Sequence, residues 1–163
     1  MGALQKDILE YKKQLGKGAI QKAYRGLMEY ILSLRTHFNK AHPELAPSGI
    51  YTGYMDMTYF ALLPTSLKER GLKIAIVFLH ETFRFEVWLS GYNKGIQSKY
   101  WKFFKESGWS RYRLVTPEKG IDSILESILV QDPDFSDTLA LTKQIEKGTL
   151  KFIWDVEEKL GSE

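Results

Sequence analysis

The feature that most constrains this fold is a pair of apolar segments separated by a short connection. Leu72 to Leu79 is an almost uninterrupted apolar run of strand length, and Phe83 to Leu89 alternates with a period of two. The connection His80-Glu81-Thr82 is too short for the crossover that a parallel pair of strands needs. The two segments are therefore expected to form an antiparallel hairpin at the centre of a sheet.

Alternation along the second of these strands separates its side chains into two groups, because successive residues project to opposite faces of a sheet. One group is wholly apolar and consists of Phe83, Phe85, Val87 and Leu89. The other group consists of Arg84, Glu86 and Trp88. A charged and aromatic face opposite an apolar one is the most unusual local feature of the chain.

Two helices are predicted before the sheet. From Gly18 to His42 the apolar residues recur at steps of three and four, as on one buried helical face. This helix is expected to end by Ala41 or His42, because Pro43 disfavours helical angles in the residue before it. A shorter helix precedes it and ends at the Gly16-Lys17-Gly18 break, with an apolar side made of Leu4, Ile8, Tyr11 and Leu15. Together they predict a helical hairpin.

Further strands and a helix are predicted around the central hairpin. Ile50 to Leu62 lacks a helical period and predicts a long first strand. Thr65 to Gly71 predicts a turn or one short helical turn. Asn93 to Glu106 predicts an amphipathic helix, and the alternation in Arg111 to Val115 predicts a charged edge strand.

Two helices are predicted at the C-terminal end. Thr116-Pro117-Glu118 has the hydroxyl cap and the proline of a helix start, and the buried face would be Ile121, Leu125 and Ile128. Asp132-Pro133-Asp134 interrupts that helix. Asp134 or Ser136 would cap a last helix, whose residues facing the core would be Leu139, Ile145, Phe152, Val156 and Leu160.

The fold class is α+β: an antiparallel sheet of about four strands packed with an N-terminal helical hairpin, a middle helix and two C-terminal helices. The length of 163 residues is close to that of one domain, and no stretch resembles a linker, so residues 1–163 are expected to form a single domain. Apolar residues make up 44 % of the chain and charged residues 26 %, which favours a packed core over disorder.

Composition excludes several classes of site. The chain has no cysteine, which excludes disulfides, thiol nucleophiles and thiolate metal sites and favours reducing surroundings. Met1 to Leu15 lacks the pattern of a signal peptide, and no stretch approaches the roughly 20 apolar residues of a membrane span, so a cytoplasmic protein without a membrane role is expected. The net charge of +3 is below that of a dedicated nucleic-acid binder, so a nucleic-acid partner is not expected.

Known cofactor and metal motifs are missing from the sequence. Gly16-Lys17-Gly18 lacks the preceding strand and the spacing of a phosphate-binding loop. The histidines His37, His42 and His80 fall in different elements without metal-ligand spacing. We therefore expect no cofactor and no metal site, and surface, cap or turn roles for the three histidines.

Polar and aromatic residues of two strands predict a ligand pocket. Tyr54, Asp56 and Thr58 share one face of the predicted first strand, and the register decides whether Glu86 lies on that face too. The alternative is an Arg84–Glu86 ion pair on a half-covered sheet surface. The leading hypothesis is a non-catalytic binding or accessory domain that recognises a polar small molecule or a peptide, with no catalytic residue. Its ligand-binding residues would be Tyr54, Asp56, Arg84, Glu86 and Trp88.

A metal-dependent hydrolase is an alternative function for the same carboxylates. Asp56 and Glu86 could share a divalent cation if they lay within a few ångströms of it. The pattern is similar to that of restriction-endonuclease-like nucleases, in which a Lys follows the second acidic residue by two positions. In Glu86-Val87-Trp88 a Trp stands in that place, so the chain would at most be a degenerate member.

Nucleic-acid binding by the middle helix is a further alternative. Basic side chains that alternate with aromatic ones can contact a phosphate backbone, while the aromatic rings stack on the nucleobases. The competing interpretation is an ordinary amphipathic helix with solvated lysines, because the period places Tyr100 inside. The residues that would contact nucleic acid are Lys94, Lys99, Trp101 and Lys102.

Three segments resemble an uncharacterised prokaryotic family of small stand-alone proteins. They are Leu27-Met28-Glu29-Tyr30 with Leu34-Arg35, Tyr54-Met55-Asp56-Met57-Thr58-Tyr59-Phe60, and Arg84-Phe85-Glu86-Val87-Trp88-Leu89-Ser90-Gly91-Tyr92-Asn93. The likeness spans nearly the whole chain. This family is a domain of unknown function with no established activity, cofactor or catalytic residue. The resemblance therefore implies a prokaryotic cytoplasmic origin and carries no site residue to this chain.

Overall fold

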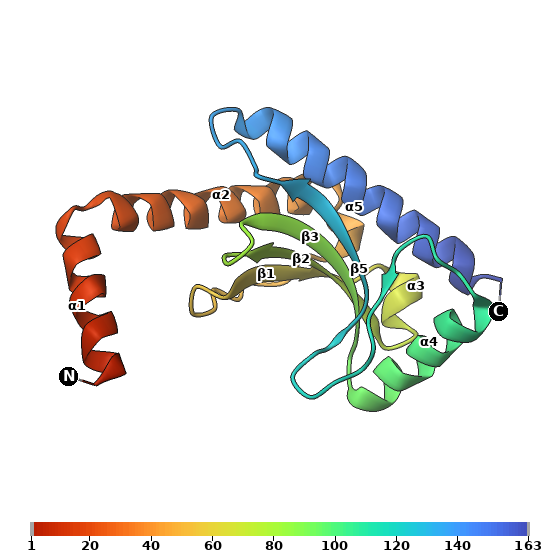
Figure 1. The fold of residues 1–163 in the computed structure, drawn as a ribbon. Helices are drawn as coiled ribbons and strands as arrows, with labels where there is room; N and C mark the ends of the chain where they lie inside the picture. Colours follow the sequence, from red (N-terminus) through yellow and green to blue (C-terminus); the bar gives the residue numbers. More distant parts are fainter. Residues whose placement is uncertain (1, 163) are drawn as a thin grey trace. The chain divides into compact units, whose positions relative to one another are not determined.

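The computed structural model of the chain describes residues 2–162, drawn as a ribbon in Figure 1. The chain divides into two compact units, Met1–Leu34 and Arg35–Glu163. The expectation that residues 1–163 form a single domain stays a prediction. Within the described residues, no helix combines the length and the apolar character that crossing a membrane requires.

The first unit contains α1 (Ala3–Gly16) and the larger part of α2 (Ala19–Ala41). Both predicted helices are confirmed, and Gly18 lies between them with a positive φ of 81°. No residue of α1 is buried, and Leu4 is 74 % exposed. The predicted apolar side of α1 is therefore largely exposed, whereas a helical hairpin would bury it against the second helix.

The second unit is built on one antiparallel sheet of five strands in the order β1-β2-β3-β5-β4. The strands are β1 (Met57–Leu62), β2 (Leu72–Leu79), β3 (Arg84–Gly91), β4 (Arg113–Leu114) and β5 (Ser123–Gln131). The antiparallel hairpin β2–β3 is confirmed, with β4 as the predicted edge strand. The sheet is the frame on which all the site residues below are placed.

The register of the strands separates a core face from an open face. The partners Phe60, Ile76 and Val87 form one cross-strand row, and all three are buried. The adjacent row, Tyr59–Val77–Glu86, lies on the opposite face, because successive residues alternate. The predicted groups Phe85, Val87, Leu89 and Arg84, Glu86, Trp88 are therefore on opposite faces of β3. Phe83 was wrongly included, because it lies in the preceding turn with a positive φ and is 47 % exposed.

Helices complete the core of the second unit. The short α3 (Thr65–Lys68) follows β1, as predicted for this turn. The middle helix α4 (Lys94–Ser107) packs on β3 and β5 through buried Tyr100 and Phe104, and the Asn93 side chain caps it by accepting from the Ile96 N–H at 2.9 Å. Helix α5 (Thr138–Leu160) packs on β5 and β3 and lies alongside β5 in Figure 1.

The prediction of a long strand from Ile50 was wrong for its first half. Only Met57–Leu62 is a strand, and the preceding residues turn back so that Tyr51 forms an isolated bridge with Tyr59. Positive φ angles at Gly53 (73°) and Met55 (62°) make this turn possible. A Cβ at Gly53 would lie 2.0 Å from the Met57 carbonyl oxygen, so a glycine is required there.

The prediction of a helix after Thr116 was also wrong, because this segment contains β5. Ile121, Leu125 and Ile128 are spaced at steps of four and three, and such a short apolar run fits a buried strand equally well. In the structure Leu125 is buried while Ile128 is 49 % exposed. Pairing with β3 decides the outcome, so the sheet has five strands and the C-terminal end has one helix.

Two details of α5 differ from the prediction. Asp137 caps the helix by accepting from the Ala140 N–H at 3.1 Å, whereas Asp134 accepts from Ser136 in the loop before it. Leu139 is 79 % exposed instead of facing the core. The other predicted inward residues, Ile145, Phe152, Val156 and Leu160, are buried.

Candidate functional site

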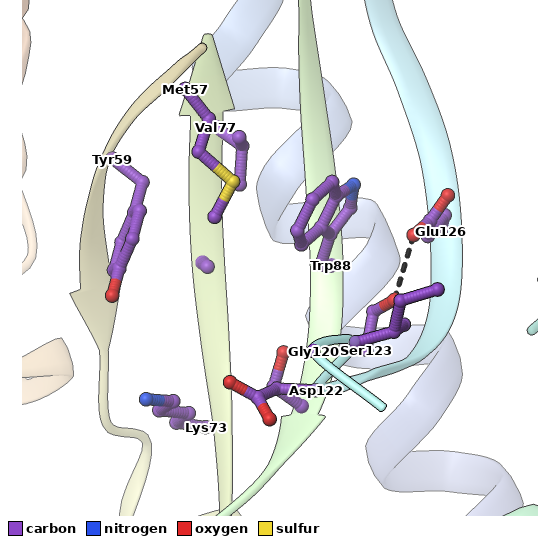
Figure 2. A pocket seen from close by; sticks show the side chains of 12 residues that line it. Met57, Tyr59, Lys73, Val77, Trp88, Gly120, Asp122, Ser123 and Glu126 are labelled. Atoms are coloured by element: carbon purple, nitrogen blue, oxygen red, sulfur yellow. Dashed lines mark hydrogen bonds between the residues drawn. The ribbon is translucent and has the colours of Figure 1, made fainter. Parts of the chain in front are cut away.

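The open face of the sheet carries a pocket of about 320 Å³, shown from close by in Figure 2. Its floor comes from Met57 and Tyr59 of β1, from alternate residues of β2, and from Trp88 and Ser90 of β3. Its far wall comes from the loop before β5 and from the start of β5. The residues of β2 and of that wall are Lys73, Ala75, Val77, Gly120, Ile121, Asp122, Ser123 and Glu126.

Glu86 fixes the aromatic side chain in the floor of the pocket. This carboxylate is 2 % exposed and accepts two hydrogen bonds from residues of its own strand, one from a charged donor and one from a neutral donor. The Trp88 Nε1–H donates to its Oε1 at 2.9 Å, and the Arg84 Nε–H donates to its Oε2 at 2.6 Å. Alternation thus brings together Arg84, Glu86 and Trp88, and the carboxylate holds the indole ring in one orientation.

Two polar groups at the pocket have no partner among residues 2–162. The Lys73 ammonium makes no ion pair or hydrogen bond with the residues that the structure describes, and the Tyr59 hydroxyl makes no hydrogen bond with them. In Figure 2 the Lys73 ammonium and the Asp122 carboxylate lie at the same end of the pocket. Asp122 is already paired with Lys94 at 3.4 Å. Lys73 is therefore the cation that can receive an anionic group from a ligand.

Glu126 forms part of the opposite wall and is occupied on both oxygens. The Ser123 hydroxyl donates to its Oε2 at 2.7 Å, and Arg113 donates to its Oε1 at 3.4 Å. Its partner across the strands is Trp88. With both oxygens accepting hydrogen bonds, this carboxylate is a fixed polar wall and is poorly placed to take a proton from a substrate.

The structure does not bring Tyr54 and Asp56 into this pocket. Tyr54 is 91 % exposed in the turn before β1, and its N–H donates to Asp56 Oδ1 at 2.8 Å. Backbone hydrogen bonds from Tyr54, Met57 and Asp56 itself lower the pKa of Asp56. These hydrogen bonds give Asp56 a structural role in stabilising the turn before β1.

The juxtaposition of Asp56 with Glu86 is absent because of the register. Tyr59 pairs with Val77, which pairs with Glu86, so Tyr59 is the β1 residue level with Glu86 on the open face. Alternation directs position 56 away from that face. Among residues 2–162, no three His, Asp or Glu side chains are grouped as metal ligands would be. The shared cation site that a hydrolase would need is therefore not formed by Asp56 and Glu86.

His80 and Thr58 form a hydrogen-bonded pair near the end of β2. The Thr58 hydroxyl donates its proton to the Thr52 carbonyl at 2.6 Å, and His80 Nε2 lies 2.8 Å from the same hydroxyl oxygen. The imidazole must therefore donate its Nε2–H to that oxygen. Burial lowers the pKa of His80. Thr58 is held as a donor to the backbone, so His80 does not activate it as a nucleophile.

The basic residues of α4 do not form one uniform surface. The Lys94 ammonium donates to the Ile121 carbonyl at 2.6 Å and so ties α4 to the loop that walls the pocket. Lys99 and Lys102 are exposed, and the Lys99 ammonium lies 5.2 Å from the centre of the Tyr100 ring. Trp101 is half-buried, and its Nε1–H has no hydrogen-bond partner among the described residues.

Sequence reasoning missed most of the pocket. Lys73 carried a usable signal, because it is the one charged residue in the apolar run of β2. Tyr59 was hidden by the uncertain register of β1. Ser123 and Glu126 were hidden by the wrong assignment of their segment to a helix. Of the predicted trio of β3, Trp88 forms part of the floor, Glu86 holds its indole ring, and Arg84 donates to Glu86.

Comparison with known proteins identifies the family alone. No curated protein and no solved structure matches the chain. A family model described as a domain of unknown function, DUF7000, matches residues 4–160. This match covers nearly the whole length of 163 residues. The chain therefore belongs to the DUF7000 family.

Proposed function

We propose that this protein is a non-catalytic binding domain whose sheet-face pocket takes a small molecule with a flat apolar body and one carboxylate group. The observation that carries the proposal is the unpartnered Lys73 ammonium at the edge of an apolar floor. A cation without a counter-ion beside a concave apolar surface favours a ligand that has an anionic group for the cation and an apolar body for the surface.

The floor supports the apolar body of the ligand. Ala75 and Val77 are buried side chains of β2, and the Trp88 ring lies beside them, held by its hydrogen bond to Glu86. A fixed indole offers a flat surface on which an aromatic or aliphatic group can stack at little entropic cost. The volume of about 320 Å³ suits a molecule of roughly amino-acid size.

The polar end supports the carboxylate. Lys73 supplies a positive charge, and the Tyr59 hydroxyl supplies a neutral donor on the neighbouring strand. A carboxylate that met both would gain a charge-assisted and an ordinary hydrogen bond. Glu126, which lines the opposite wall, already accepts two hydrogen bonds, and so does Glu86, which holds Trp88; this favours a binding role over acid–base chemistry. The absence of cysteine supports a cytoplasmic setting for this binding.

The experiment is a binding screen with matched acids and amides. Phenylacetate, indole-3-acetate and octanoate are compared with their neutral amides by thermal shift and calorimetry. We expect at least one acid to raise the melting temperature while its amide does not. Lys73→Met should weaken binding of that acid by about tenfold or more, because it removes a hydrogen bond to a charged group.

The matched control is Lys147→Met, which removes a positive charge from an exposed position of α5. It should bind the acid as the wild type does. Equal stabilisation by acid and amide would contradict the carboxylate part of the proposal. Loss of binding in Lys147→Met to the same degree as in Lys73→Met would contradict the role of Lys73, as would a failure of every acid to bind.

A further inference from the structure

A second hollow, of about 260 Å³, lies further along β3 and β5 from the sheet-face pocket. It is lined by three arginines from two parts of the chain: Arg84 at the start of β3, and Arg111 and Arg113 in and before β4. Tyr112 and Ser127 contribute to the same lining. Three positively charged side chains that line one concavity need an explanation, because like charges repel each other unless something compensates them.

Each of the three guanidinium groups is held by one carboxylate. Arg84 donates to Glu86 at 2.6 Å, Arg111 to Asp155 at 2.9 Å, and Arg113 to Glu126 at 3.4 Å. The side chains of Glu86 and Asp155 are 3 % and 0 % exposed. The carboxylates therefore fix the arginines in place from the protein side and stabilise the cluster.

Each arginine keeps most of its hydrogen-bonding capacity for a ligand. A guanidinium has five N–H donors, and each of these arginines uses a single nitrogen on its carboxylate. The Arg84 and Arg113 side chains are 23 % and 72 % exposed, so their remaining donors can reach a molecule in the hollow.

We propose that this hollow binds the phosphate group of a small phosphomonoester. A phosphomonoester carries a charge between −1 and −2 at neutral pH and has three terminal oxygens, which match several fixed guanidinium forks. A single carboxylate and a phosphodiester each offer only two terminal oxygens, so both would meet fewer of the N–H donors that the carboxylates leave free. The hollow is distinct from the sheet-face pocket, although Glu126 lines both.

The test measures binding of inorganic phosphate, phenyl phosphate and diphenyl phosphate by calorimetry at constant ionic strength. We expect phosphate and phenyl phosphate to bind, and the diester to bind at least about tenfold more weakly. Arg113→Ala should weaken phenyl phosphate by about tenfold or more, because hydrogen bonds to charged groups contribute most of such affinity. Arg113 is exposed on the two-residue strand β4, so the variant should fold, which circular dichroism checks.

Two controls keep the outcome interpretable. Lys143→Ala removes a positive charge from an exposed position of α5 outside the hollow and should bind phenyl phosphate like the wild type. Arg84→Lys keeps the charge beside Glu86 but loses the planar fork and should weaken binding as well. Equal losses in Lys143→Ala and Arg113→Ala would overturn the proposal, as would equal binding of monoester and diester or no binding of phosphate. None of these results depends on Lys73, so the two sites fail or succeed separately.

Discussion

The indole N–H of Trp88 donates a 2.9 Å hydrogen bond to Glu86, two residues before it on the same strand of the open sheet face. The other carboxylate oxygen accepts from Arg84. Trp88 lines the sheet-face pocket and Arg84 lines the arginine hollow. One buried carboxylate therefore positions a side chain in each of the two concave sites.

Glu86→Gln should destabilise the protein, because an amide cannot accept from both donors as the carboxylate does. The Arg84 guanidinium would lose its buried counter-charge, and the expected fall in the free energy of unfolding is roughly 1–3 kcal/mol. Urea denaturation measures it. Glu81→Gln in the exposed turn between β2 and β3 is the matched control and should be neutral. A neutral Glu86→Gln would contradict the positioning role of this carboxylate.

Asp155→Asn should change how stability depends on pH. Burial opposes ionisation of Asp155, but hydrogen bonds from Lys151 and Tyr112 outweigh it and hold the pKa below its ordinary value of 3.8. The folded state therefore binds fewer protons than the unfolded state in acid. This contribution to stability is complete above the unfolded pKa and is lost as the pH falls through the folded one.

Urea unfolding between pH 2.5 and 6 tests this dependence in wild type and variant. Wild type should lose stability more steeply below about pH 4 than Asp155→Asn does. Glu158→Gln is the matched control, because it removes a carboxylate from an exposed position of the same helix, and it should lose stability in acid as wild type does. If the stability of wild type and of Asp155→Asn fell in parallel in acid, the folded state would not stabilise the ionised form of Asp155.

Predictability from sequence followed the length and clarity of the local pattern. The hairpin β2–β3 could be predicted because its apolar run, its alternation and its short connection all agree. Helix α2 could be predicted because its apolar residues keep the helical spacing over many turns and because Pro43 marks its end. The segment that forms β5 is short, and its spacing suits a helix or a strand. Only its pairing with β3, a contact distant in sequence, decides between them.

The candidate site was predictable only in part for the same reason. Alternation within β3 groups Arg84, Glu86 and Trp88 from local sequence alone. The residues that complete the pocket, Tyr59 and Glu126, depend on the registers of other strands. Asp56 was misplaced because the register puts Tyr59 level with Glu86, so that even-numbered positions of β1 face the other way. The turn at Gly53 also shortens β1, and a tight turn with positive φ leaves only a weak signal in one sequence.

Gly53→Ala should destabilise the turn before β1. The glycine has a φ of 73°, and an added Cβ would lie 2.0 Å from the Met57 carbonyl oxygen, so the backbone would have to shift. The free energy of unfolding should fall by about 1–3 kcal/mol. Gly49→Ala is the control, because nothing lies within 4 Å of its Cβ position, and it should be neutral or slightly stabilising. Chemical denaturation of both variants decides whether the turn is as tight as described.

The most direct test of ligand binding on the open sheet face uses the indole N–H signals in a proton–nitrogen NMR spectrum. The chain has four tryptophans, Trp88, Trp101, Trp109 and Trp154, and only Trp88 lines the pocket. Titration with the acid selected by the binding screen should shift the Trp88 signal most, and Lys73→Met should abolish that shift. A shift centred on any of the other three tryptophans, or one that persists in Lys73→Met, would contradict the proposed site.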